Sequence, residues 1–501
     1  MDPGAVQRLP TDLDEGLWPL VDRTLDVLEV AGVAVAVVRD EDVATHCWGV
    51  RDVETRTPVT AETMFHLASV SKTFVATAVV SLAAARGEVA PALDLDAPVT
   101  RWLPELVLAD GRADEVTARG LLSHTSGLPD VSEYGWHDPQ LHDAALSDFA
   151  RSLAGWRLQS EPGSTFSYSN AGYELLGLLL SRVAGTTFEE AVRRQVLAPL
   201  GLQHSTFLRS EVPPGRAASP HVGMPLTVPQ VAYPYTRRHS PSSTLHSSVL
   251  ELGRWVVALC ASADADTDDT DDRPWAPLDA DLLAQLWRPV VPVGDPPWEE
   301  SWGLGWALGS YRGHRTVSHS GADPGFGSRL VVVPERRTGV VVLANSNTVP
   351  TASLAQAALD VVLADPGTRP ADGEGLAALR EMLPPVSRPV ADALSRSGPE
   401  AGAAAFRRLS EEDPPAYDLD DEELANAVWG AIELHRTDLV RPLLELWTTV
   451  RPESSEAWTM AGWAHQVDGD LDAARDLLRR ALELDPDNQD AALIAGNLPP
   501  V

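Results

Sequence analysis

Residues 329–345 read Arg-Leu-Val-Val-Val-Pro-Glu-Arg-Arg-Thr-Gly-Val-Val-Val-Leu-Ala-Asn. Two apolar runs, 329–333 and 339–345, are rich in β-branched residues and flank a short polar link that contains proline. This pattern is typical of two strands joined by a tight connection, so the sequence predicts a β-hairpin here.

A similar pattern lies near the other end of the chain. The apolar run 32–38 predicts a buried strand, residues 39–42 predict a turn, and residues 43–50 are the expected hairpin partner. More than two hundred residues rich in helical signals separate the two hairpins. A sheet built from both ends of a segment, with a helical insertion between them, is an α/β architecture with two lobes and a cleft. We therefore predict an antiparallel sheet flanked by helices, with an all-helical insertion lobe.

The composition changes near residue 366. Pro, Gly and Asp interrupt the pattern there, and no strand signal remains beyond about residue 389. We therefore expect a linker at residues 366–385 and an all-α helical-repeat domain at residues 386–501.

One repeat is clear in this tail, at residues 455–488. A 34-residue register that starts at Ser455 places Trp, Pro and small or apolar residues where tetratricopeptide repeats use them. The matching residues are Trp458, Gly462, Ala474, Leu478, Ala481 and Pro486. Such solenoids usually need three or more repeats, and the upstream repeats match more weakly. We therefore expect the tail to contact the preceding domain, a second copy in a homo-oligomer, or a protein partner.

The composition limits the class of protein. The chain has 501 residues, 44% of them hydrophobic, and a formal net charge of −33. This charge would repel phosphate backbones and anionic lipids, so neither nucleic acid nor a membrane is an expected partner. The first forty residues contain no basic stretch followed by an apolar core, so we expect a cytoplasmic protein. The two cysteines, Cys47 and Cys260, predict neither a disulfide framework nor a metal site.

Lysine is almost absent from the sequence. Lys72 is the only lysine, and every other residue among the 39 counted as Lys or Arg is Arg. An arginine does not lose its proton in a protein, whereas a lysine can be tuned to act as a base. The single lysine therefore suggests a role that needs an amine.

Lys72 belongs to a short motif, Ser69-Val70-Ser71-Lys72, that precedes an apolar stretch with helical spacing. The spacing predicts that the motif lies on the first turn of a helix. A separation of three residues puts Ser69 and Lys72 on one helical face, within hydrogen-bonding reach. The helix N-terminus also favours developing negative charge. A Ser-x-x-Lys match is common by chance, and alone it favours an ordinary helix cap.

Two further motifs favour catalysis over a cap. Tyr168-Ser169-Asn170 follows a turn-like segment and precedes a helical run, so it is expected on a loop that enters a helix. A phenol beside an ammonium can relay a proton, and an Asn amide can accept from Lys and donate to a substrate carbonyl. His319-Ser320-Gly321 comes just before the terminal hairpin, at what should be a sheet edge that faces the cleft.

The three motifs resemble Ser-x-x-Lys, Tyr-x-Asn and Lys/His-x-Gly of the serine β-lactamase, penicillin-binding protein and esterase superfamily. The similar branch contains class C β-lactamases and their esterase and peptidase relatives. The resemblance covers residues 15–365. Three flanking stretches support it: residues 121–128 (Leu-Leu-Ser-His-Thr-Ser-Gly-Leu), Gly303-Leu304-Gly305-Trp306, and Pro241-Ser242-Ser243.

The resemblance implies a role for each matching residue. Ser69 would be the nucleophile, Lys72 and Tyr168 the proton-transfer pair, and Asn170 an orienting amide. No cofactor is expected for this chemistry.

The third motif would form the opposite side of the site. His319 takes the place that Lys often holds, Gly321 completes the motif, and the backbone N–H groups of Ser69 and Ala322 would form the oxyanion hole. A histidine is neutral near pH 7 unless its pKa is shifted, so recognition of a substrate carboxylate is weaker. This difference favours esters, D-amino-acid amides or acyl transfer over efficient penicillin hydrolysis.

We therefore predict a serine hydrolase that forms an acyl-enzyme with an ester or amide of a small molecule or peptide. One alternative is an acyl transferase or peptide-cyclising thioesterase of the same fold. An alternative of another class is a helical-repeat interaction protein with an inactive hydrolase domain.

Five aromatic residues could serve either the core or the site. For His124 we expect a structural hydrogen bond, although a place near the cleft is compatible with its motif. The tryptophans are expected either to pack in the core or to line an apolar acyl pocket; they are Trp287, Trp298, Trp302 and Trp306.

Overall fold

The computed structural model describes residues 13–84, 93–131, 133–222, 233–262, 278–346, 348–364, 373–412, 414–433 and 436–498. The chain forms two compact units. The first consists of residues 1–23, 31–220 and 232–380, and the second of residues 24–30, 221–231 and 381–501. The segment predicted as a linker, 366–385, contains helix α11, Glu374–Glu381, after residues that lie outside the described range.

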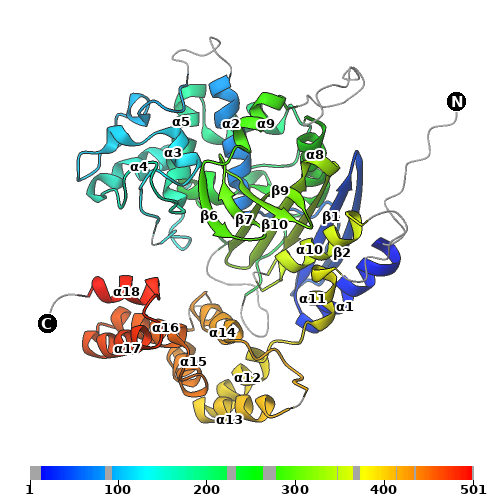
Figure 1. Cartoon of the computed structure of the whole chain (residues 1–501), viewed down its shortest axis with the longest axis vertical. Coiled ribbons are helices and arrows are strands. Elements are labelled where there is room, and N and C mark those ends of the chain that lie inside the picture. Colours follow the sequence, from blue (N-terminus) through cyan, green and yellow to red (C-terminus); the bar gives the residue numbers. More distant parts are fainter. Residues whose placement is uncertain are drawn as a thin grey trace. The chain divides into compact units, whose positions relative to one another are not determined.

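A nine-stranded antiparallel sheet organises the first unit (Figure 1). Its strand order is β3-β2-β1-β11-β10-β9-β8-β7-β6. The strands are β1 Gly32–Arg39, β2 Asp42–Asp52, β3 Thr57–Pro58, β6 Val291–Asp295, β7 Glu299–Trp302, β8 Ala307–Tyr311, β9 His314–Asp323, β10 Phe326–Val333 and β11 Thr338–Ala344. Both predicted hairpins are confirmed, as β1–β2 and β10–β11.

The two hairpins meet at the centre of the sheet. Strand β1 pairs with β11, so that Val35 lies opposite Val342. Both strands are buried on both faces, which explains why each reads as a continuous apolar run instead of an alternating pattern. The predicted antiparallel sheet flanked by helices is therefore confirmed.

The expected position of the His319 motif at a sheet edge was wrong. His319 lies on β9, and three further strands, β8, β7 and β6, extend the sheet beyond it. These strands are four or five residues long and contain Gly, Pro and Trp, so their β-pattern is weak in the sequence. The stretch Gly303–Trp306, quoted above as a flank of the motifs, connects β7 and β8.

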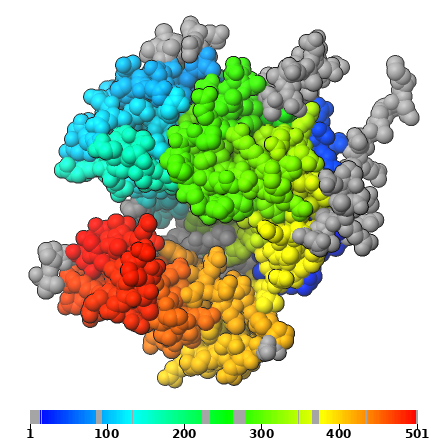
Figure 2. Space-filling view, in the orientation of Figure 1, coloured from blue at the N-terminus to red at the C-terminus, as the bar shows by residue number. Residues whose placement is uncertain are grey.

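Helices cover the sheet and build the insertion lobe. Helix α2 is apolar all around and buried along nearly its whole length, as expected for a helix inside a core. Helices α8 and α10 both pack on β11. The helices are α1 Trp18–Leu28, α2 Ser71–Ala84, α3 Ala118–Leu122, α4 Ala145–Ser152, α5 Asn170–Ala184, α6 Phe188–Val192, α7 Ser240–Ser243, α8 Val249–Ser262, α9 Ala280–Leu286 and α10 Thr351–Val362. In the space-filling view the insertion lobe, in cyan, meets the green region near β6–β9 along a continuous seam (Figure 2).

A short strand pair lies at the base of the insertion lobe, where the lobe joins the rest of the unit. Strand β4, Phe65–His66, pairs with β5, His246–Ser247. This pair lies next to the start of α2, so the segments at both ends of the lobe are joined close to Ser69.

The second unit is helical. Successive helices pack as antiparallel pairs, α12 with α13, α14 with α15, and α16 with α17, and α18 packs on α17. Their bounds are α12 Ser387–Ser397, α13 Pro399–Ser410, α14 Asp421–Glu433, α15 Thr437–Val450, α16 Ser455–Val467, α17 Leu471–Leu484 and α18 Gln489–Gly496. A Cβ on Gly462 would lie 2.7 Å from Leu478 Cγ, so the small residue of the predicted repeat lets α16 and α17 approach closely.

None of the helices in the described part of the chain combines the length and the apolar character needed to cross a bilayer.

Candidate active site

Ser69 lies at the start of α2, in a 3-10 turn formed by residues Ala68–Val70. Ala68 has φ of +45°, a left-handed conformation that is uncommon for a residue with a side chain. Lys72, one turn later, points its Nζ at the Ser69 Oγ at 2.8 Å and at the Ser242 carbonyl oxygen at 2.8 Å. The structure thus brings the predicted hydroxyl and amine together.

The Lys72 side chain is fully buried. Burial lowers the pKa of Lys72 from 10.5 to about 8, because an ammonium loses its hydration there. The negative charges of Glu174, Asp130 and Asp323 oppose this shift. The amine therefore has a neutral form that is accessible near neutral pH.

Tyr168 covers the amine from the loop that enters α5. Lys72 Nζ lies 5.1 Å from the centroid of the Tyr168 ring. Burial raises the pKa of Tyr168 well above its ordinary value, and hydrogen bonding with Ser69 opposes that shift only in part. Tyr168 is therefore a neutral phenol in the resting site, and both it and Lys72 reach Ser69.

The His124 ring packs against the ring of Tyr168. The two rings stack with centroids 4.2 Å apart, and His124 Nδ1 accepts a hydrogen bond of 3.0 Å from the backbone N–H of Ser169. Burial lowers the pKa of His124 well below its ordinary value, so the ring is neutral. The expected structural hydrogen bond of His124 is thus present, and the residue also borders the site.

Asn170 begins α5, and Ser169 caps that helix by accepting from the Gly172 N–H. The Asn170 Nδ2 group donates to Asp130 at 2.8 Å, so one of the two N–H donors expected to meet a substrate carbonyl is occupied. Its Oδ1 is buried without a hydrogen-bond partner among the described residues. In this arrangement Asn170 fixes the loop of Asp130 and keeps one acceptor free inside the site.

His319 approaches from the sheet. Its Nδ1 lies 2.6 Å from the Ser320 carbonyl oxygen, so Nδ1 carries the proton and Nε2 is a bare acceptor. That Nε2 is buried without a partner among the described residues. Burial lowers the pKa of His319 to about 3, and the charge of Lys72 adds to the shift. His319 is therefore neutral at physiological pH.

Gly321 and Ala322 lie next on β9. A Cβ on Gly321 would lie 2.5 Å from the Leu67 carbonyl oxygen and 2.8 Å from the Ser69 backbone nitrogen. Only glycine lets the strand approach the nucleophile's backbone this closely. Ala322 pairs with Gly327 of β10, and it follows Gly321 on the strand that contacts the turn of Ser69.

One tryptophan borders this site. Trp302 lies edge-on to His319 at 5.4 Å and to Tyr168 at 5.9 Å between ring centroids. Trp287 and Trp306 pack against each other, and Trp298 stacks on Tyr311. Of the two expectations for the tryptophans, core packing holds for these three, while Trp302 forms a wall of the site.

Behind Lys72 lie two polar residues, Ser242, which the sequence offered only as part of a flanking stretch, and Glu174, which sequence reasoning missed. Ser242, on α7, supplies the carbonyl that Lys72 contacts, and its hydroxyl donates to Glu174 Oε1 at 2.6 Å. The signal that could have revealed Glu174 is a lone carboxyl group inside the apolar helical run 172–183.

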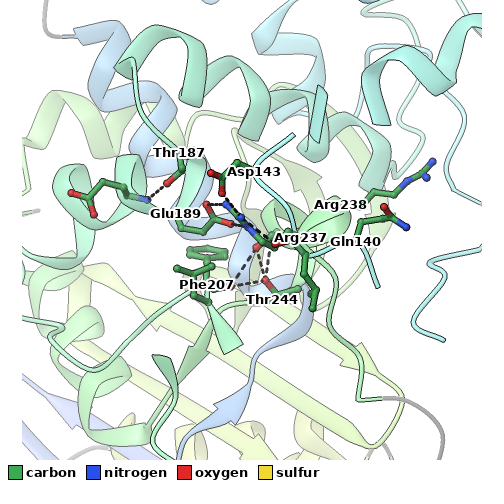
Figure 3. Close-up of polar contacts among 12 residues, drawn as sticks. Gln140, Asp143, Thr187, Glu189, Phe207, Arg237, Arg238 and Thr244 are labelled. Carbon is green, nitrogen blue, oxygen red and sulfur yellow. Dashed lines mark hydrogen bonds and ion pairs between the residues drawn. The ribbon is translucent and has the colours of Figure 1, made fainter. Parts of the chain in front are cut away.

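The segment that carries Ser242 is held by hydrogen bonds and ion pairs at Thr236 and Arg237, several residues before Ser242 (Figure 3). Arg237 donates to both carboxylate oxygens of Glu189, at 2.7 and 2.9 Å, and to Asp143 at 2.5 Å. The Gln140 backbone N–H donates to Thr236 Oγ1 at 2.9 Å. These bonds fix residues 236–243 between α6 and the loop before α4.

Comparison with known proteins agrees with this fold. Residues 20–363 match the Beta-lactamase family model, and residues 455–488 match a tetratricopeptide repeat model. The chain belongs to the beta-lactamase family and carries a tetratricopeptide repeat in its tail. The predicted resemblance is therefore confirmed in both parts.

Individual relatives vary in their named activity. The chain is 28% identical over 353 residues to an unguisins hydrolase of Aspergillus violaceofuscus, covering 67% of this chain and 62% of that protein. It is 37% identical over 239 residues to the esterase EstB of Burkholderia gladioli, covering 45% of this chain and 59% of that protein. The chain thus spans about three fifths of the length of these curated relatives.

Among solved structures, an octameric penicillin-binding protein homologue from Pyrococcus abyssi is similar. It matches with a TM-score of 0.60 and 26% identity, over 71% of this chain and 78% of that one.

Proposed function

We propose that this protein is a serine hydrolase that cleaves an ester or amide through an acyl-enzyme on Ser69. The observation that carries the proposal is the 2.8 Å contact between Nζ of the buried Lys72 and Ser69 Oγ. A hydroxyl needs a base within hydrogen-bond reach to become a nucleophile, and a buried amine with a pKa of about 8 is suited to that role.

The proposed proton path follows from the charge states of the two neighbours. The neutral form of Lys72 takes the proton of Ser69 as the oxygen attacks the substrate carbonyl, and the backbone N–H groups of Ser69 and Ala322 hold the oxyanion. Tyr168, a neutral phenol, can give its proton to the leaving group and recover one from Lys72. Water then releases the acyl group by the reverse path.

Because His319 of the third motif is neutral, we propose that the substrate group it binds is also uncharged. His319 offers a bare Nε2 acceptor and no positive charge, so it fits an N–H or O–H group better than a carboxylate. The relatives named as an esterase and as a hydrolase support ester or amide cleavage. We propose esters and D-amino-acid amides or peptides as the substrate class, with Asn170 and Gly321 shaping the site.

We also propose a role for each part of the chain. Residues 15–365 would carry the catalysis, residues 366–385 would link the domains, and residues 386–501 would contact a protein partner or a second copy. A tetratricopeptide match in the tail and an octameric structural relative support this assignment.

The test is intact-mass measurement after exposure to activated esters, D-amino-acid amides, thioesters and β-lactams. We expect an adduct with at least one acyl class on the wild type and none on Ser69→Ala. An adduct of equal yield on Ser69→Ala would refute the nucleophile, and no adduct or turnover with any class would refute the proposed chemistry.

A further inference from the structure

Glu174 is a buried carboxyl group that the proposed proton path does not use. It lies on α5 with no exposed surface, among apolar residues of the same helix. Burial raises the pKa of Glu174, because an isolated carboxylate is costly away from water. A charge in such a place needs specific partners or it disrupts the core.

Glu174 has two partners, and both bind the same oxygen. Ser242 Oγ donates to Oε1 at 2.6 Å, and His239 Nδ1 lies 3.1 Å from Oε1. Oε2 is buried without a hydrogen-bond partner among the described residues. Ser242 and His239 are themselves buried, so the cluster is closed to solvent.

Ser242 connects this cluster to the amine. Its hydroxyl holds Glu174 while its carbonyl oxygen accepts from Lys72 Nζ at 2.8 Å. One residue therefore touches the carboxyl group with its side chain and the amine with its backbone. Among the charges that act on Lys72, Glu174 has the largest effect of those that favour the ammonium form.

Other charged and titratable groups also face these two side chains. Those that act on Lys72 from the remaining walls are Asp130, Asp323, Tyr168, Tyr173, His124 and His319. The ring centroids of Tyr134 and His239 lie 5.0 Å apart, and burial, helped by the negative charge of Glu174, raises the pKa of Tyr134. Asp130 is exposed, and Asp323 pairs with His66 at 2.7 Å. Of these carboxyl groups, Glu174 alone is linked to Lys72 through one shared residue.

We propose that Glu174 is a positioning residue for Lys72: through Ser242 it fixes the carbonyl that orients the amine, and its charge balances the buried ammonium. The consequence for acylation rests on the proposed function, whereas the effect on the protonation of Lys72 does not. Without the carboxylate, the ammonium would be less favoured and Lys72 would lose its proton at lower pH.

The chain offers a direct readout, because Lys72 is its only lysine. Lysine labelled with ¹³C at Cε gives one protein signal, whose shift follows the charge of Nζ. In Glu174→Gln the amide oxygen can keep both bonds of Oε1, and the NH₂ replaces an oxygen that has no partner, so the variant removes the charge with little change of shape. We expect the titration midpoint of Lys72 to fall by about 1 pH unit.

A matched control is Glu251→Gln. Glu251 is a buried carboxyl group on α8 that accepts from the backbone of His204 and Ser205. Its loss should lower the melting temperature and leave the Lys72 titration unchanged. If Glu174→Gln does not fold, Ser242→Ala replaces it: this variant keeps the carbonyl but removes the donor to Glu174, and a smaller shift in the same direction is expected.

The outcome separates the two proposals. A midpoint that moves in Glu174→Gln but not in Glu251→Gln supports the inference, even if no substrate is ever found. A midpoint that stays within about 0.2 unit of wild type in the folded variant overturns it, since a counter-charge normally shifts a neighbour by more than that. With an active substrate, the acidic limb of the acylation rate should shift by the same amount as the titration.

Discussion

Lys72 and His319 are two basic side chains buried in one site, yet they end in different charge states. Burial lowers the pKa of both, Lys72 to about 8 and His319 to about 3. Around Lys72, the carboxyl groups of Glu174, Asp130 and Asp323 restore part of the affinity for a proton. His319 has the Ser320 carbonyl as its hydrogen-bond partner, and the positive charges of Lys72 and Arg329 disfavour its protonation.

The difference shows what makes a buried base usable. Burial alone lowers the pKa of a basic group until the group stays neutral at physiological pH. Negative neighbours raise that pKa again, and their number decides whether the group still exchanges a proton near neutral pH. In the proposed mechanism, Lys72 and Tyr168 on the helical side of the site would therefore transfer protons, while β9, which carries His319 and Gly321, would contribute shape and neutral hydrogen bonds.

The largest effect is expected for Lys72→Arg. Arginine keeps the positive charge but cannot act as a base, and general-base assistance contributes about 10²- to 10⁴-fold. We expect a folded variant that acylates at least about a hundredfold more slowly, measured by single-turnover acylation so that slow deacylation does not hide the effect. A rate within a few-fold of wild type would mean that Lys72 supplies only charge.

Gly321→Ala tests the strand wall. The new methyl group would lie within 3 Å of the Leu67 carbonyl and the Ser69 nitrogen, so the strand or the nucleophile must move. We expect acylation to slow by about 10- to 100-fold, since small displacements of reacting groups cost that much. Gly327→Ala is the control, because its nearest contact would be an ordinary 3.4 Å. Equal rates for the two alanine variants would show that the close approach is irrelevant.

His319→Gln should have a smaller effect. Glutamine can also offer a neutral acceptor, and one hydrogen bond is worth about 1 kcal/mol, or about fivefold in rate. Because the pKa of His319 lies near 3, the pH dependence of acylation between pH 5 and 7 should be the same in the variant and in wild type. Loss of a titration limb in that range would show that His319 becomes an imidazolium there and would contradict its low pKa.

The last prediction concerns stability instead of rate. Both groups have a lower pKa in the folded than in the unfolded protein, so the unfolded state binds more protons between the two values and stability rises with pH there. For His319 this range is about pH 3 to 6.5, and for Lys72 about pH 8 to 10.5. Urea unfolding should show His319→Gln flattening only the acidic range and Lys72→Met only the alkaline one, each by up to about 1.4 kcal/mol per pH unit. A variant that flattens the other range would contradict the assigned pKa values.

Much of the fold could be predicted from the sequence because its central strands are unusually apolar. Runs such as Gly32–Val38 are buried on both faces, so a simple pattern identifies them. Strands β6–β8 were not predicted because they are only four or five residues long and contain Gly, Pro and Trp, so they give no clear apolar run.

The site shows the same division. Ser69, Lys72, Tyr168 and His319 belong to local motifs and could be found by spacing. A lone carboxyl group in an apolar helical run marks Glu174 as unusual, but its link to Lys72 could not be predicted, since it depends on α7, which begins 66 residues later and reaches Glu174 only in the folded structure. Tertiary contacts between distant polar residues leave no periodic signal.

The pairing of β1 with β11 has a consequence for synthesis of the chain. Thr338 and Val38, which are joined by a hydrogen bond across these strands, lie 300 residues apart. At typical translation rates of 5–20 residues per second, β1 waits about 15 to 60 s for its partner. During that time one edge of the β1–β2 hairpin exposes unpaired backbone groups beside valine side chains, which is a template for aggregation.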